Sequence, residues 1–75
     1  SMTKISMRTR PEVVSKGVDL QQALTLACEG REGCSGGGHR IAAGAFIPRE
    51  EERAFIEDVN RILAQQYAQS CQDHR

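Results

Sequence analysis

Residues 34–44 read Cys-Ser-Gly-Gly-Gly-His-Arg-Ile-Ala-Ala-Gly, so a histidine and an arginine directly follow three consecutive glycines. The nine residues 30–38 contain five glycines, which predicts a loop, because glycine loses the most backbone freedom when it is ordered. Backbone amides in such a loop can approach an anion without a Cβ in the way. The stretch predicts either a phosphate-binding loop or a flexible surface connection.

The residues after the glycines bear on this choice. The alanine pair within residues 40–43 favours a short helical turn, whose N-terminus would add partial positive charge beside the loop. The alternative is that these residues run straight into a strand with residues 45–47. His39 and Arg40 would supply a titratable and a permanent donor to phosphate oxygens, although a histidine in such a place, taken alone, is more often structural than a ligand contact.

Two familiar nucleotide-binding loops do not fit the glycine run. A P-loop ends in Gly-Lys-Ser or Gly-Lys-Thr, and that ending is absent here. The glycines also lack the spacing of the dinucleotide-binding signature. Both functions are set aside.

The segment before the loop predicts one strand. Residues 4–9 alternate polar and apolar side chains, which is the period of a half-buried strand. The apolar side chains then face the core and the polar ones share the opposite face: Ile5 and Met7 inside, Lys4, Ser6 and Arg8 outside.

Capping signals and apolar spacing predict the helices. Pro11 can open a helical turn that Gly17 closes, and Asp19 can cap a helix over residues 20–29. An acidic run followed by a broad apolar stripe predicts a helix over residues 49–68. We expect an α/β domain over residues 3–69, with a small mixed sheet containing residues 4–9 and 45–47 and two main covering helices, and a frayed tail at residues 70–75.

Composition sets limits on function. With 75 residues, 39% of them hydrophobic, the core is thin and a missing neighbouring domain is expected. The formal net charge is zero, but residues 1–48 carry six basic and four acidic side chains, or +2, which places anion binding in that part. The sequence has no apolar run of membrane-spanning length, and a cytoplasmic protein is expected.

The three cysteines suggest reduced thiols, because an odd number does not close a disulfide framework. A zinc site built from Cys28, Cys34, His39 and Cys71 is an alternative. Its spacing is poor, since no Cys-x-x-Cys pair is present. We therefore expect no metal ligand in this chain.

The stretch GGGHRIAAGAFIP, preceded by KISMR, resembles the C-terminal DHH-associated domain of the DHH phosphoesterase superfamily. That superfamily includes RecJ-like exonucleases, oligoribonucleases and cyclic dinucleotide phosphodiesterases. The flanking stretches RPEVVSKGVDLQQAL and IPREEERAFIEDVN are most similar to archaeal RecJ-like nucleases.

The resemblance implies a substrate-binding role. In the family, an N-terminal DHH catalytic domain holds manganese or magnesium, and a metal-activated water attacks the phosphodiester. The associated domain holds the substrate, which would be single-stranded nucleic acid or a phosphate-containing nucleotide. The resemblance implies that the residues binding it are Gly36, Gly37, Gly38, His39, Ser6 and Arg8. Arg40 is added to this set because it directly follows the glycines and His39. The chain lacks the Asp-His-His motif, so no catalytic residue is expected in it, and whether the protein is a hydrolase depends on the other domain.

A function of a different class stays open. The domain could be a non-catalytic module that forms a homodimer or docks a replication or repair protein, with the glycine run as a connector. Ile56 and Tyr67 lie in the last predicted helix but are not needed for the apolar stripe that packs on the sheet. They would supply the contact with the partner. Basic side chains around the loop would then serve only solubility.

Overall fold

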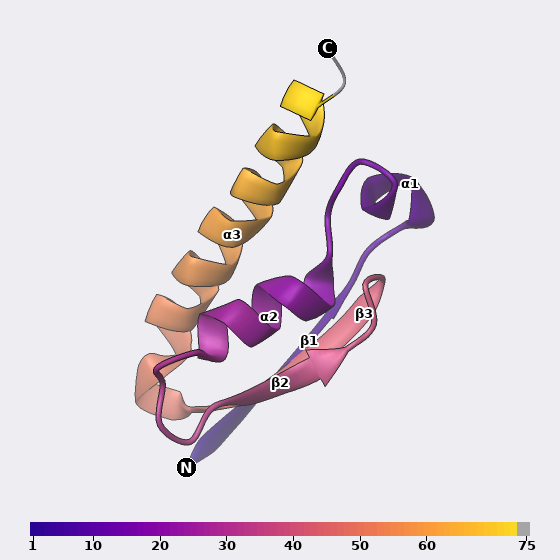
Figure 1. Ribbon diagram of the computed structural model, residues 1–75. Coiled ribbons are helices and arrows are strands. Elements are labelled where there is room, and N and C mark those ends of the chain that lie inside the picture. The colour runs from indigo at the N-terminus through magenta and orange to yellow at the C-terminus, as the bar shows by residue number, and fades with distance from the viewer. Residues whose placement is uncertain (74–75) are drawn as a thin grey trace.

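Three short strands form one antiparallel sheet, and two helices pack on one of its faces (Figure 1). The computed structural model describes the backbone of residues 1–73 and the side chains of residues 1–69. The elements in chain order are β1 (Met2–Arg8), α1 (Pro11–Val14), α2 (Leu20–Cys28), β2 (Ser35–Gly38), β3 (Ala42–Pro48), the 3-10 turn η1 (Arg49–Glu51) and α3 (Glu52–Asp73). The expected α/β class with two main helices is confirmed.

The strand order is β1-β3-β2, so β3 is central and β2 is an edge strand. Both pairings are antiparallel, with Ser6 and Gly37 each opposite Gly44. The expectation of a mixed sheet was therefore wrong. A short turn joins β2 to β3, and a connection of that length can only join antiparallel neighbours.

The core lies between the sheet and the two longer helices. Its largest fully buried side chains are Leu24 from α2, Ile47 from β3 and Phe55 from α3. The alternation expected for the first strand is confirmed, since Ile5 and Met7 pack against this core. Within residues 1–73, no helix packs on the other face of the sheet, and that face carries the candidate site.

The sequence suggested that the whole glycine run, residues 30–38, is a loop, and the structure corrects this for its second half. Ser35–Gly38 form strand β2, and residues 42–43 begin β3 rather than a helical turn. Pairing explains both results, because β2 and β1 flank β3 and fix its backbone on two sides. The turn between β2 and β3 closes through His39, whose N–H donates to the carbonyl of Ala42 at 2.8 Å.

The helix boundaries follow the capping signals closely. Gly17 has a φ of 103° after α1, and the Asp19 carboxylate accepts from the N–H of Gln22 at 3.0 Å to cap α2. Helix α3 continues to Asp73, beyond the expected end at residue 68. The predicted frayed tail, residues 70–75, lies outside the residues whose side chains are described. No helix within the described chain has the length and apolar character needed to cross a membrane.

One buried amide ties α3 to the start of α2. Gln66 is 9% exposed and is the one buried polar residue among the described side chains. Its Oε1 accepts from the N–H of Asp19 at 2.9 Å, and its Nε2 donates to the Asp19 carbonyl at 3.1 Å and to Gln22 Oε1 at 2.9 Å. Gln66 therefore satisfies both backbone polar groups of the residue that caps α2.

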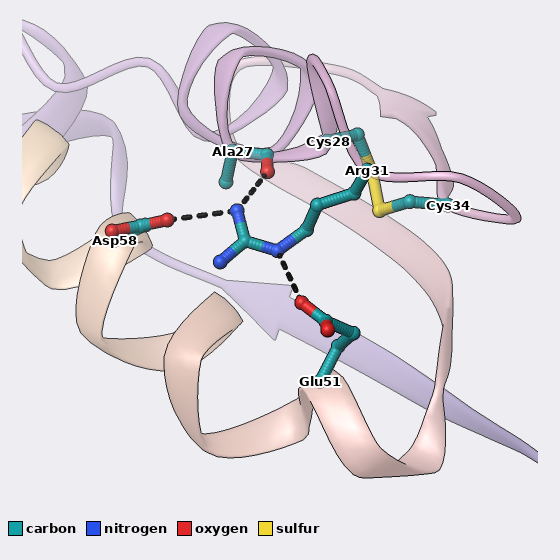
Figure 2. Close-up of a disulfide and its surroundings, with 6 residues drawn as sticks. All are labelled: Ala27, Cys28, Arg31, Cys34, Glu51 and Asp58. Carbon is teal, nitrogen blue, oxygen red and sulfur yellow. Dashed lines mark hydrogen bonds and ion pairs between the residues drawn. A yellow bond between two sulfur atoms is a disulfide. The ribbon is translucent and has the colours of Figure 1, made fainter.

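The loop between α2 and β2 is closed by a disulfide, which corrects the expectation of reduced thiols. Cys28 and Cys34 are bonded, with their Cα atoms 5.3 Å apart (Figure 2). An odd number of cysteines does not exclude a disulfide, because two of the three can form one bond and the third stays outside it. With both sulfurs in this bond, the zinc alternative loses two of its four ligands, while the side chain of Cys71 lies outside the described residues.

Arg31, inside that loop, joins three elements (Figure 2). Its Nη1 donates to the carbonyl of Ala27 at 2.7 Å and pairs with the Asp58 carboxylate at 2.7 Å, and its Nε pairs with Glu51 at 3.2 Å. Hydrogen bonds to Asp58 and Glu51 raise the pKa of the guanidinium further above its usual range. Arg61 also donates to Asp58, and these hydrogen bonds from Arg61 and then Arg31 lower the pKa of the Asp58 carboxyl.

We predict that Gln66→Ala lowers the free energy of unfolding by about 1–3 kcal/mol, because the N–H of Asp19 loses its partner in a partly buried position. Urea unfolding followed by circular dichroism measures the change. Gln65→Ala is the matched control, since the Gln65 side chain is exposed on the same helix. Equal destabilisation by the two substitutions would contradict the role given to Gln66.

We also predict that Asp58→Asn destabilises the domain at neutral pH and has a shrinking effect as the solution is acidified. The folded pKa of Asp58 is lowered, so its contribution is present above the unfolded value of about 3.9 and is lost as the pH falls from there towards the folded pKa. Urea midpoints measured from pH 7 downward test this, with Glu57→Gln as control. A gap between wild type and Asp58→Asn that does not depend on pH would refute the assignment.

Candidate functional site

The face of the sheet opposite the helices holds most of the residues predicted to form the site. Outward positions along β1 place Lys4, Ser6 and Arg8 on this face, in line with the predicted alternation. Outward positions along β3 add Ala42, Gly44 and Phe46, which lie opposite them in register. Two residues of β2, Ser35 and Gly37, complete the face through their pairing with Phe46 and Gly44.

A row with almost no side chain crosses the middle of this face. Ser6, Gly44 and Gly37 are register neighbours on β1, β3 and β2, and none has a side chain longer than a hydroxymethyl group. A hollow of about 350 Å³ lies over this row, and its lining includes Ser6, Arg8, Gly37, Gly38, Ala42 and Gly44. A ligand in the hollow could therefore approach the sheet backbone directly.

The three consecutive glycines have three different surroundings. A Cβ on Gly36 would lie 3.4 Å from the Leu24 carbonyl oxygen, an ordinary contact distance between β2 and α2. Gly38 has a φ of 136°, and a Cβ there would come within 2.7 Å of the Ala42 carbonyl oxygen. A Cβ on Gly37 would meet nothing within 4 Å. Backbone strain and close contacts thus explain Gly38, whereas a Cβ at Gly36 would make only ordinary contacts and a Cβ at Gly37 would meet no atom of the described domain.

The charge on this face has one sign. Lys4 and Arg8 lie at its two ends, and the three described strands contain no aspartate or glutamate. Glu51, just before α3, pairs with Arg31 of the α2–β2 loop. The open face is therefore suited to an anion.

The structure separates the predicted site residues into two groups. Ser6, Arg8, Gly37 and Gly38 line the same hollow. Gly36 lines a neighbouring hollow through its backbone, His39 is exposed at the β2–β3 turn, and Arg40 pairs with Asp19 at 3.7 Å beside α2. Arg40 contributes to a different surface from Arg8.

The predicted contribution of a helix N-terminus to anion binding is wrong, because a strand follows the turn. The edge of the sheet can supply the backbone donors that were expected from the helix N-terminus. Since β2 has a partner on one side only, alternate backbone N–H groups of Ser35–Gly38 point away from β3 and are free to donate. The backbone donors expected from a loop are thus available from a strand.

Sequence reasoning did not include Lys4, Gly44 and Phe46 in the site. The alternation along β1 already placed Lys4 beside Ser6, so its inclusion needed no further information. Gly44 and Phe46 required the register of β3, which depends on recognising residues 42–43 as strand. Their positions follow from the pairing of Gly44 with Ser6 and of Phe46 with Lys4.

The described residues contain no group of three or more His, Cys, Asp or Glu side chains that could hold a metal ion. The expected manganese or magnesium therefore has no ligand set in this part of the chain. No step of a metal-assisted reaction is assigned to these residues.

These features define a small α/β domain with one face covered by helices and one open, basic face floored by glycine. The chain belongs to the DHHA1 domain family, whose model matches residues 2–65 and which is associated with DHH phosphoesterases. The match covers all three strands, both hollows of the open face and most of α3.

A relative of this chain is the uncharacterized protein MJ0831 of Methanocaldococcus jannaschii, which is 32% identical over 65 residues. The alignment covers 87% of this chain and 15% of that protein. The chain thus corresponds to a small part of its relative's length.

We predict opposite outcomes for two neighbouring glycines. Gly38→Ala should destabilise the domain by about 1–3 kcal/mol, because alanine is strained at this φ and its Cβ meets backbone atoms. Gly37→Ala should leave the free energy of unfolding unchanged or raise it by up to about 1 kcal/mol, because its methyl group enters open space. Thermal unfolding of both variants tests this, and a Gly37→Ala variant as unstable as Gly38→Ala would contradict it.

Proposed function

We propose that this domain binds the phosphate groups of single-stranded nucleic acid on its open sheet face, as the substrate-holding part of a RecJ-like DHH-family phosphoesterase. The observation that carries the proposal is the bare row of Ser6, Gly44 and Gly37 beneath a hollow with Arg8 at its rim. The row offers the Ser6 hydroxyl, the β2 edge beside it offers backbone N–H groups, and Arg8 offers a permanent charge. Phosphate oxygens are acceptors that suit both.

Each group has a distinct role in this proposal. The Arg8 guanidinium pairs with a phosphate, the Ser6 hydroxyl donates to it, and Gly37 keeps a Cβ out of the way. Free N–H groups along the β2 edge donate to the same or the next phosphate. His39 follows Gly38 at the exposed turn and adds a donor when the nucleic acid extends past the end of the strand.

Hydrolysis is assigned to a different part of the protein. The family association supports a partner DHH catalytic domain, which would supply manganese or magnesium and the attacking water. The present domain would contribute by positioning the phosphodiester and by matching its charge. We propose no catalytic residue among those described.

A docking function is the second candidate, and it has its own support. Ile56 and Tyr67 on α3 are 44% and 46% exposed. An apolar hollow of about 170 Å³ lies between β1 and α3, with Ile5, Met7 and Ile56 in its lining. The surface would receive another domain or a second copy, and sedimentation that shows a tight dimer without nucleic-acid binding would favour this function over the first.

We predict that Arg8→Gln weakens binding of a short 5′-phosphorylated single-stranded DNA by roughly fivefold, or about 1 kcal/mol, through loss of one charged phosphate contact. The slope of log affinity against log salt should also fall by about 0.7 for the single strand. Fluorescence anisotropy over a salt titration measures both quantities.

Arg10→Gln is the matched control, since it removes the same charge at an exposed position outside the hollow. It should change affinity less than Arg8→Gln does. If the two variants bind alike, general charge attraction explains the binding and the assigned contact is wrong.

A further inference from the structure

We infer that Phe46 forms a base-stacking subsite beside the phosphate-binding row, so that the open face takes a base together with its phosphate. The inference rests on the proposed nucleic-acid binding and names a residue that would make the domain prefer nucleotides to phosphate alone.

The position of Phe46 is the first observation. Its side chain is 50% exposed, whereas the other phenylalanine, Phe55, is fully buried in the core. Phe46 lies on the central strand, between Lys4 of β1 and Ser35 of β2, so strands flank it on both sides towards the Lys4 end of the open face. No packing of the described domain requires a large apolar side chain there.

The second observation is the shape around the ring. A hollow of about 230 Å³ is lined by Phe46, Lys4 and Ser35, and it shares Gly37 and Gly44 with the phosphate hollow. Because both shared residues are glycines, no side chain separates the two hollows. Phe46 is two residues along β3 from Gly44, or about 7 Å, which is within the reach of a single nucleotide.

Charge is the third observation. The Nζ of Lys4 is 6.0 Å from the centre of the Phe46 ring, and Arg8 lies at the other end of the face. A ligand that covers the ring therefore meets a cation on each side of the glycine row. The Lys4 ammonium lies over the ring and Arg8 lies beyond the glycine row, opposite Ala42. Once the flexible Lys4 side chain moves off the ring, a base stacked on Phe46 would have a cation near the phosphate on either side of it, the arrangement that single-stranded nucleic acids present.

The chemistry of the subsite also limits what it can recognise. Stacking on Phe46 uses the face of a base, and every base has one. The neighbouring side chains Lys4 and Ser35 can contact phosphate or sugar as readily as a base edge. The subsite should therefore accept any base with little sequence preference.

The test compares two probes on the 75-residue chain: a short 5′-phosphorylated oligothymidylate and an abasic strand of the same length and phosphate count. Wild type should bind the oligothymidylate about tenfold more tightly, within the range for loss of one stacked base. Phe46→Leu should remove this preference while leaving abasic binding unchanged, since leucine keeps an apolar side chain but offers no ring. Phe46→Trp should retain the preference.

The outcomes separate this inference from the proposed function. Equal binding of both probes by wild type, or a preference that survives in Phe46→Leu, overturns the stacking subsite and leaves phosphate binding in place. Failure of wild type to bind either probe overturns the proposed function itself. Circular dichroism of Phe46→Leu checks that the exposed substitution leaves the fold intact.

Discussion

The candidate site depends on holding a strand of glycines in an extended form. Such a strand has little tendency to order, because glycine loses the most backbone entropy on folding. In this domain β2 is fixed at both ends: Cys34 is bonded to Cys28 just before the strand, and the turn at His39 closes onto Ala42 just after it. Between these ends, the strand pairs with β3 and packs against α2, and both contacts favour its extended form.

The turn after β2 is itself held by the rest of the chain. The carbonyl of Ile41 accepts from the N–H of Thr9 at 2.9 Å, and the carbonyl of Arg40 accepts from the N–H of Leu20 at 3.0 Å. These two bonds link the turn to the end of β1 and to the first residue of α2. The turn is therefore held by backbone hydrogen bonds, and the side chains of the site are not needed to hold it.

The parts of the fold that could be predicted are those set by local patterns. Alternation along β1, the Asp19 cap and the positive φ of Gly17 depend on neighbours in sequence, and all three are observed. The glycine strand could not be predicted in this way, since nothing local favours it and only its pairing with β3 makes it extended. The same holds for Phe46, whose exposure follows from the register of β3 and not from its own hydrophobicity. The disulfide likewise required knowing that the loop brings Cys28 and Cys34 together.

The bonds of Gln66 give α3 a mechanical connection to the turn. The side chain of Gln66 is hydrogen-bonded to both the N–H and the carbonyl of Asp19. The next residue, Leu20, donates its N–H to the carbonyl of Arg40 in the turn. The carboxylate of Asp19 pairs with the side chain of the same arginine. The position of α3 and the position of the β2–β3 turn are thus coupled through the backbone of Asp19 and Leu20, although no direct contact between helix and turn is needed.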